Sequence, residues 1–175
     1  MRTRSPLPSD RAALVELIDP PDLPPDLPPD SPPDSTSTNP FRPEERACAI
    51  ELLEAVLDPP EGNTYEARIL VGDDERPLCY ACFGQTPMTE ATFDLYWLVT
   101  AAASRGQGLG KRLLAAVEQE LATRRALTIR VETSSLEGQG GALRFYQQAG
   151  YDVVGRIADF YRPGDDLITL AKRLG

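Results

Sequence analysis

A glycine-rich turn between a strand pattern and a helix pattern constrains the fold of this chain more than any other feature of its sequence. Thr92–Val99 is rich in β-branched and aromatic residues, which predicts a strand. The turn Arg105–Gly110 follows, and Gly108–Arg124 then places apolar residues on one helical face, at Leu109, Leu113, Leu114, Val117 and Leu121. Such a turn presents unpaired backbone N–H groups and the positive end of the helix dipole. The sequence therefore predicts an anion-binding loop at the start of this helix.

Three phosphate-binding motifs compete for this loop. A P-loop needs glycine five residues before Gly-Lys and then Ser or Thr, whereas this chain has Arg105 and Arg112 at those positions. A dinucleotide fingerprint needs G-x-G-x-x-G, and the spacing of Gly106, Gly108 and Gly110 does not supply it. The pattern [Arg/Gln]-x-x-Gly-x-[Gly/Ala] fits Arg105, Gly108 and Gly110. On the loop alone, a glycine-rich helix start without a ligand stays an alternative.

Charge and composition narrow the class of partner. The chain has 175 residues and a formal net charge of −9, so we do not expect a basic surface for nucleic acid. The acidity suits a cationic or amine substrate, and it also keeps a protein soluble. No apolar run approaches the roughly 20 residues of a membrane span, and no secretory leader is evident. We therefore expect a single domain over residues 1–175, located in the cytoplasm and without a membrane partner.

A segment rich in proline and aspartate interrupts the chain at about residues 19–40. It repeats Pro-Pro-Asp and holds five aspartates and no basic residue, so it carries much of the negative charge. Paired prolines oppose helix and sheet hydrogen bonding. Met1–Leu7 predicts a short edge strand, and Ser9 predicts the N-cap of a helix after it. We therefore expect a solvated low-complexity insertion within the domain rather than a tail.

The chain has three cysteines, Cys48, Cys79 and Cys82, and their odd number suggests free thiols. Cys79 and Cys82 have the C-x-x-C spacing but lie in a predicted strand, where positions three apart face opposite sides. The chain has no histidine and no second cysteine pair. We therefore expect no metal site and interpret these thiols as structural residues of a strand.

The remaining patterns complete a mixed α/β order. Arg42-Pro43-Glu44-Glu45 predicts a helix start, and Gly141–Ala149 predicts a short helix ended by Gly150 as a left-handed cap. Further strands are predicted at Tyr65–Val71, Leu78–Phe83, Leu127–Val131, Asp152–Ile157 and Leu167–Ala171. The order is strand, helix, helix, three strands, helix, strand, helix, two strands. We expect a mixed sheet with helices on its faces.

Two motifs in this order resemble those of the GCN5-related N-acetyltransferase (GNAT) superfamily. Arg105–Lys111, with the sequence Arg-Gly-Gln-Gly-Leu-Gly-Lys, is similar to its acetyl-CoA pyrophosphate loop. Gly141–Tyr151, a helix with Phe-Tyr, then three residues, then Gly and an aromatic residue, is similar to its later motif. The resemblance covers nearly the whole chain. It implies an α+β fold with a mostly antiparallel sheet of about six or seven strands, about four flanking helices, and splayed strands that form an acetyl-CoA cleft.

The resemblance also implies an acetyl-CoA site, without a metal, residue by residue. The strand before the loop is expected to hold the pantetheine arm and the acetyl carbonyl through the backbone of Leu98, Val99 and Thr100. The pyrophosphate is expected on the loop, at Arg105, Gly106, Gln107, Gly108, Leu109, Gly110 and Lys111. Gln139 stands where the superfamily often has asparagine against the pantetheine arm. The superfamily's typical Asp-Pro after the third strand is Ala101-Ala102 here, which weakens the turn signal but not the phosphate site.

Tyr146 matches the tyrosine whose role in the superfamily is to protonate the departing coenzyme A thiolate. A phenol with a pKa of about 10 suits this donation, although core packing alone would also explain the residue. The general base is open because the chain has no histidine. Glu132 is the first candidate, and Asp94 on the neighbouring strand is the second. Some related ribosomal-protein acetyltransferases have glutamate where this chain has Arg130, which is expected to share a face with Glu132.

The acceptor is expected to bind between the loop joining the first two helices and the loop joining the last two strands. Asp159, Phe160, Tyr161 and Asp166 are assigned to the second of these loops, and Tyr96 and Trp97 are expected to wall the cleft. The residues expected to bind the acceptor are Asp94, Tyr96, Phe160 and Tyr161.

These assignments imply N-acetyl transfer from acetyl-CoA to a primary amine by direct attack in a ternary complex. The expected acceptor is a small-molecule amine or a peptide N-terminus. The oligomeric state is left open between a monomer and a homodimer, because relatives are often dimers. A non-catalytic acyl-CoA-binding or regulatory domain on the same fold is one alternative. A nucleotide-binding module is the other.

Overall fold

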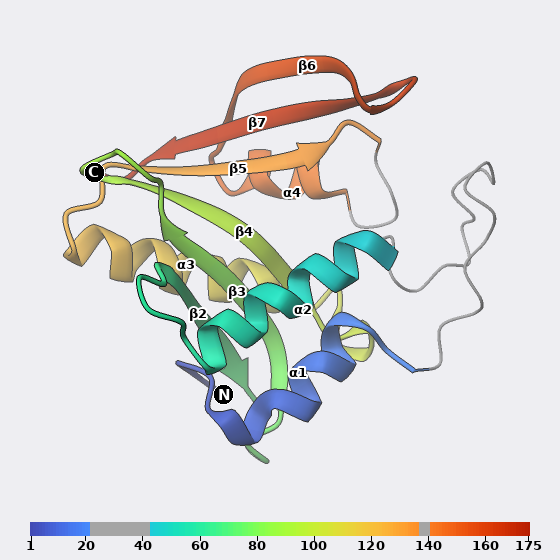
Figure 1. Ribbon diagram of the computed structural model, residues 1–175, viewed down its shortest axis with the longest axis vertical. Helices are drawn as coiled ribbons and strands as arrows, with labels where there is room; N and C mark the ends of the chain where they lie inside the picture. The colour runs from blue at the N-terminus through green and yellow to red at the C-terminus, as the bar shows by residue number, and fades with distance from the viewer. Residues whose placement is uncertain (22–42, 137–140) are drawn as a thin grey trace. The chain divides into compact units, whose positions relative to one another are not determined.

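The computed structural model describes residues 1–21, 43–136 and 141–175 (Figure 1). These residues form seven strands and four α-helices, and the strands follow the order β1-β2-β3-β4-β5-β7-β6 in one sheet. They divide into two compact units, which we call the first unit (Met1–Phe83 with Trp97–Val117) and the second unit (Gly84–Tyr96 with Glu118–Gly175). The predicted mixed sheet and the predicted order of helices and strands are confirmed. Most of the predicted insertion at 19–40 lies outside the described residues.

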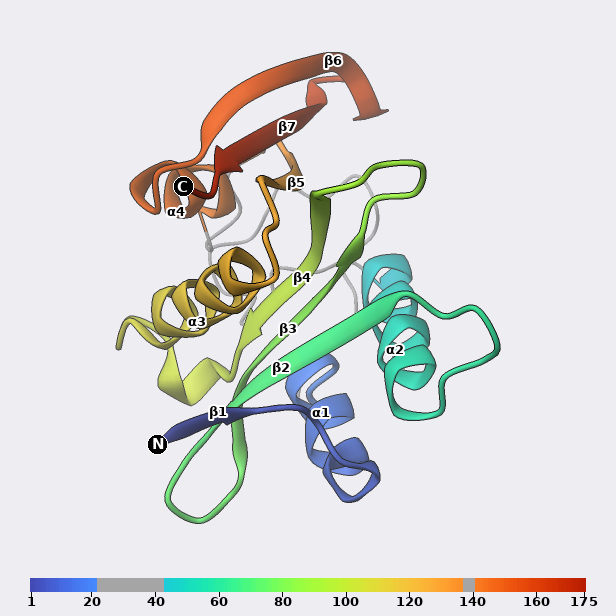
Figure 2. The same ribbon diagram turned by 90° about the vertical axis from the view of Figure 1, so that its left-hand side faces the viewer.

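The first unit is built on β1 (Arg2–Arg4), β2 (Tyr65–Val71) and most of β3 (Pro77–Gln85). The helices α1 (Arg11–Ile18) and α2 (Pro43–Leu57) pack side by side, and α2 packs against β2 (Figure 2). β1 pairs antiparallel with β2. The core includes the fully buried side chains of Leu14, Leu53, Ile69 and Phe83. These side chains come from α1, α2, β2 and β3, so helices and strands share one apolar core.

The start of α1 differs from the prediction. A 3₁₀-helix, Pro8–Asp10, precedes α1, so the N-cap residue is Asp10 and not Ser9. The Asp10 carboxylate accepts a hydrogen bond from the backbone N–H of Leu7 at 2.7 Å. Proline has a φ compatible with a helical turn, so the 3₁₀-helix begins at Pro8. Ser9 therefore lies inside this turn, and α1 begins after it. The predicted start of α2 at Pro43 is confirmed.

Two elements run through both units, β4 (Thr92–Thr100) and α3 (Leu109–Thr123). The predicted apolar face of α3 is confirmed by the burial of Leu109, Leu113, Leu114, Val117 and Leu121. Residues three and four apart lie on one side of a helix, so this spacing alone fixes which side of α3 is buried. The glycine-rich loop therefore has a firmly packed helix directly after it.

The second unit contains β5 (Thr128–Ser134), β7 (Asp165–Arg173) and β6 (Asp152–Arg162), with α4 (Ala142–Gln148) against β5 (Figure 1). β7 pairs antiparallel with both β5 and β6. β5 pairs parallel with the beginning of β4, and this pairing ends at Leu95 opposite Val131. The predicted left-handed cap after α4 is confirmed, since Gly150 has φ of +87°.

The last hairpin is longer than predicted. The segment 159–166 was expected to be a loop, but β6 continues to Arg162 and β7 begins at Asp165, so only Pro163 and Gly164 connect them. Asp159 has φ of 52°, and the pairing shifts its register between Ile157 and Arg162. An irregularity of this kind lets a strand absorb an extra residue and continue. The aspartate and the Pro-Gly turn therefore mark a bulge and a tight connection rather than a long loop.

Candidate active site

The loop between β4 and α3 has the backbone shape that the sequence predicts. A 3₁₀ turn, Ala102–Ser104, follows β4, and Gly106 and Gly108 then take φ of +73° and +75°. Residues with a Cβ rarely adopt such values, which accounts for glycine at both positions. A Cβ built at either glycine has no atom within 4 Å. The loop is therefore open on the side where these glycines leave space for a ligand.

Backbone N–H groups of the same loop lack acceptors in the described part of the chain. Arg105 N donates to Ala102 O and Arg112 N donates to Gly108 O, but no described residue accepts from the N–H groups of residues 106–111. Helices leave their first N–H groups without intrahelical partners. Because the dipole of α3 adds positive potential at the same end, the loop is suited to bind an anion.

Cationic side chains flank this loop. Arg105 and Lys111 are exposed, and the guanidinium Nε of Arg105 lies 3.4 Å from the carbonyl oxygen of Thr100. Partial desolvation of the guanidinium by neighbouring atoms lowers the pKa of Arg105 from its ordinary value, but an arginine stays charged at neutral pH. Gln107 donates from its amide to Ala103 O at 3.4 Å, which braces the turn. The predicted loop residues are therefore brought together, with positive charge at the rim.

The end of β4 leads directly into this loop. Leu98 and Thr100 are half-buried and Val99 is buried. The backbone N–H of Ala101 donates to Leu78 O at 2.9 Å, and Thr100 Oγ1 lies 3.2 Å from Cys79 Sγ. These contacts hold the last residues of β4 against β3 within the first unit.

Cys79 and Cys82 are part of that core. Both are fully buried, and burial raises the pKa of Cys79 to about 11 and that of Cys82 to about 12. Such thiols stay protonated at neutral pH and are poor nucleophiles. Cys48 is free and exposed on α2. Among the described residues, no group of histidine, cysteine, aspartate or glutamate side chains is suited to hold a metal ion.

Tyr146 lies on α4 in the second unit. The residue is 7% exposed, and its ring makes edge contacts with Phe145 and Tyr151 at centroid distances of 5.1 Å and 5.5 Å. The backbone N–H of Tyr151 donates to Tyr146 O at 3.0 Å. Residues on both sides of Tyr146 in sequence therefore contact it at the end of α4, and the aromatic contacts restrict the rotamer of the phenol.

The two candidate bases differ in their surroundings. Asp94 is buried and accepts hydrogen bonds from Arg130 Nε at 2.6 Å and Thr86 Oγ1 at 2.9 Å. Glu132 has a side chain that is 42% exposed and meets Arg130 Nη1 at 3.2 Å. Arg130 and Glu132 share a face, as predicted, and the bond to Asp94 is the main cause that raises the pKa of Arg130. Glu132 is thus the more accessible carboxylate, and Asp94 anchors the arginine.

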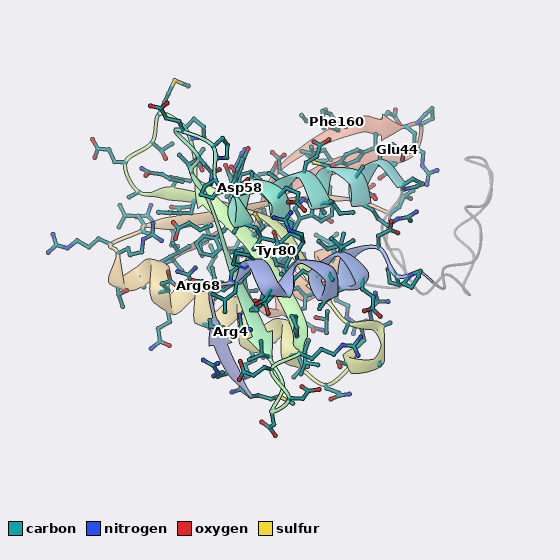
Figure 3. The ribbon with its side chains drawn as sticks, turned by 60° about the horizontal axis from the view of Figure 1, so that its bottom comes forward. Arg4, Glu44, Asp58, Arg68, Tyr80 and Phe160 are labelled. Atoms are coloured by element: carbon teal, nitrogen blue, oxygen red, sulfur yellow. The ribbon has the colours of Figure 1, made fainter. Side chains whose placement is uncertain are left out.

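The predicted acceptor residues Tyr96, Phe160 and Tyr161 are also in the second unit. Tyr96 is half-buried on β4, Phe160 is 54% exposed on β6 (Figure 3), and the Phe160 and Tyr161 rings meet edge-on. Asp166 is buried at the start of β7, and the N–H of Asp159 and the guanidinium of Arg156 hold its pKa below the ordinary value. The predicted cofactor residue Gln139 lies outside the described residues.

One polar cluster is not marked by any motif in the sequence. Lys172 Nζ on β7 donates to Glu118 Oε2 at 2.7 Å and to Ala149 O at 2.9 Å. Its partners are 54 and 23 residues away in sequence, so no local spacing indicates the contacts. A single lysine in a strand or a single glutamate in a helix is expected on the surface, so the sequence gives no reason to pair these two residues.

Comparison with known proteins agrees with this architecture. The family model described as "Acetyltransferase (GNAT) domain" matches residues 66–153. The chain therefore belongs to the GNAT family, and it is an acetyltransferase. No curated protein matches it significantly. Within the described residues, each helix is too short or too polar to cross a membrane.

Solved structures share the fold. A putative GNAT-family acetyltransferase from Desulfovibrio desulfuricans is 29% identical, with a TM-score of 0.81 and 99% coverage of both chains. The aminoglycoside 6′-N-acetyltransferase from Enterococcus faecium is 19% identical, with a TM-score of 0.73 and coverage of 100% of this chain and 98% of its own. A coenzyme A complex of an aminoglycoside 6′-N-acetyltransferase is 18% identical, with a TM-score of 0.71 and the same coverage.

Proposed function

We propose that this acetyltransferase transfers the acetyl group of acetyl-CoA to a primary amine by direct attack in a ternary complex. The observation that carries the proposal is the loop before α3, where the N–H groups of residues 106–111 have no acceptor among the described residues. These donors, the helix dipole and two flanking cations fit a pyrophosphate. The coenzyme A bound in a structural neighbour supports this choice of ligand.

The protein's own residues have separate roles in this proposal. Bound acetyl-CoA supplies the activated acetyl group. The backbone at Leu98, Val99 and Thr100 orients the pantetheine arm and the acetyl carbonyl. Tyr146 donates the proton of its phenol to the coenzyme A sulfur as the thioester bond breaks. Glu132 accepts the proton that the amine loses, directly or through a water molecule, because its carboxylate is the more exposed of the two candidates.

The acceptor in this proposal is a small-molecule amine or a peptide N-terminus. Neighbours with this fold include aminoglycoside acetyltransferases and the ribosomal-protein-S18-alanine N-acetyltransferase from Escherichia coli, whose names cover both classes. The net charge of −9 favours a cationic amine over an acidic one. Tyr96, Phe160 and Tyr161 are the aromatic residues proposed to contact this acceptor, in either a monomer or a homodimer.

Replacing Tyr146 with phenylalanine tests the chemistry. We expect Tyr146→Phe to lower kcat by about 100-fold, since general acid catalysis contributes factors of this size, and to leave the KM for acetyl-CoA nearly unchanged. The measurement is the release of coenzyme A with a panel of primary amines. Tyr80→Phe is the matched control, because Tyr80 (Figure 3) is a fully buried tyrosine on β3 that has no role in the proposed chemistry. It is expected to leave kcat unchanged.

Two results would favour the alternative functions, a non-catalytic acyl-CoA-binding domain or a nucleotide-binding module. If the protein binds acetyl-CoA tightly and releases no coenzyme A with any amine, it is a non-catalytic acyl-CoA-binding domain. If calorimetry shows tighter binding of ATP or NAD than of acetyl-CoA, the loop serves a nucleotide. Equal kcat values for Tyr146→Phe and wild type would remove only the acid role of Tyr146.

A further inference from the structure

The Lys172 cluster joins three elements of the second unit at the end of α4. We use this name for Glu118 on α3, Ala149 and Tyr151 after α4, and Lys172 on β7. Besides its two hydrogen bonds, Lys172 places Nζ 5.6 Å from the centroid of the Tyr151 ring. The side chains of Lys172 and Glu118 are 26% and 15% exposed. An ion pair this sheltered from water is stronger than a surface pair and costs more to break.

The ammonium group of Lys172 completes the end of a short helix. α4 has seven residues, and a helix of this length is not stable without tertiary contacts. Its final carbonyl groups need hydrogen-bond donors from outside the helix. Lys172 Nζ donates to Ala149 O directly after the last helical residue, where a cation also interacts favourably with the helix dipole. Lys172 therefore satisfies a carbonyl group at the end of α4, next to the left-handed cap at Gly150.

Tyr146 is in direct contact with the parts of the chain that Lys172 holds. The N–H groups of Ala149 and Tyr151 each lie 3.0 Å from Tyr146 O. The Tyr151 ring packs edge-on against the Tyr146 ring and also faces Lys172 Nζ. A shift of Ala149 or Tyr151 is therefore transmitted to the backbone and the ring of Tyr146, whereas the anion-binding loop belongs to the first unit.

We propose that Lys172 is a positioning residue for Tyr146. It holds the end of α4 and the Tyr151 ring so that the Tyr146 phenol keeps the orientation needed to protonate the coenzyme A sulfur. The inference rests on the proposed acid role of Tyr146. Lys172 acts through its contacts with Ala149 and Tyr151, so its loss reduces the rate of transfer and leaves the binding of acetyl-CoA intact.

A double-mutant cycle tests this proposal. We expect Lys172→Met to lower kcat by about tenfold, since small misplacements of a reacting group have effects of this order or larger. The KM for acetyl-CoA is expected to stay within about twofold. In the Tyr146→Phe background, Lys172→Met is expected to lower kcat no further, because the group that it positions is gone. Lys172→Arg keeps a cation at this point and is expected to recover most of the rate.

Two further variants control for structural damage. Arg173→Met removes the neighbouring cation of the same strand and is expected to leave kcat unchanged. The Nη1 of Arg173 lies 3.5 Å from Thr128 Oγ1, which is the outer limit of a hydrogen bond. If Lys172→Met does not fold, as judged by circular dichroism, Glu118→Gln replaces it in the cycle. Glu118→Gln removes the charge that fixes Lys172 and is expected to lower kcat in the same direction, again only when Tyr146 is present.

The outcomes separate this inference from the proposed function. Equal reductions of kcat in the wild-type and Tyr146→Phe backgrounds would overturn the positioning role and leave the acid role in place. A raised KM for acetyl-CoA with unchanged kcat would overturn it as well. If Tyr146→Phe alone leaves kcat unchanged, the acid role fails and the positioning role fails with it.

Discussion

At the scale of single residues, the partners of a carboxylate decide what it can do. Asp94 is buried, and its two oxygens already accept hydrogen bonds from Arg130 and Thr86. Glu132 has a partner in Arg130 and open access to solvent. The sequence places both carboxylates on neighbouring strands, but only the side-chain contacts distinguish an anchor from a candidate base.

Asp10 gives the clearest residue-scale prediction for stability. Its carboxylate meets Arg4 Nη1 at 2.6 Å and Arg4 Nη2 at 2.9 Å, and it also accepts from Leu7 N. The hydrogen bond to Arg4 is the main cause that lowers the pKa of Asp10, and the Leu7 N–H adds to it. Asp10→Asn is therefore expected to lower the free energy of unfolding by roughly 1.5–3 kcal/mol at neutral pH, as expected for hydrogen bonds to a charged group.

The pH dependence of this effect follows from the lowered pKa. The carboxylate stabilises the folded state above about pH 4, where aspartate is ionised in the unfolded chain, and the gain is lost as the pH falls through the lower folded-state value. Urea unfolding at several pH values measures the difference between wild type and Asp10→Asn, which should shrink below about pH 4. Asp73→Asn is the control, because the Asp73 side chain, which pairs with the N-terminus, is 96% exposed. Equal losses for the two variants would contradict the assignment.

At the scale of elements, the glycine-rich loop was predictable because its signals are local. Strand propensity, glycine spacing and the leucine repeat each act within a few residues, and Gly106 and Gly108 have the positive φ that glycine permits. The last hairpin was not predictable in the same way. Its aspartates and Pro-Gly turn are typical of loops, while the pairing that makes 159–162 a strand depends on β7.

Gly108→Ala tests the loop against a matched glycine. Gly108 has φ of +75° and Gly62, in a turn before β2, has φ of +79°, and neither has an atom within 4 Å of a built Cβ. Alanine at either position costs about 1–2 kcal/mol of strain in the left-handed region. We expect both variants to lose similar stability in urea, and only Gly108→Ala to weaken acetyl-CoA binding by about tenfold in calorimetry. Equal dissociation constants for the two variants would show that the loop does not contact the ligand.

At the scale of the whole molecule, the order of elements and the mixed sheet could be predicted from the sequence. Each segment has apolar residues at the spacing typical of a helix or of a strand. The division into two compact units could not be predicted, since it cuts through β4 and α3, which are continuous in sequence. The Lys172 cluster was also invisible, because it joins α3, β7 and the end of α4 over long separations. Motifs reveal the residues that recur at fixed spacing, and the groups that support them appear only when the chain is folded.

The proposed reaction moves an acetyl group from acetyl-CoA to an amine, and the whole protein is needed to test it. The most direct measurement is mass spectrometry of the wild-type reaction with acetyl-CoA and a panel of small amines and peptides with free N-termini. We expect an acetylated amine formed in equal amount to the coenzyme A released, with no acetylated protein accumulating. Acetyl-CoA that binds and yields no acetylated amine from any acceptor of either class would contradict it.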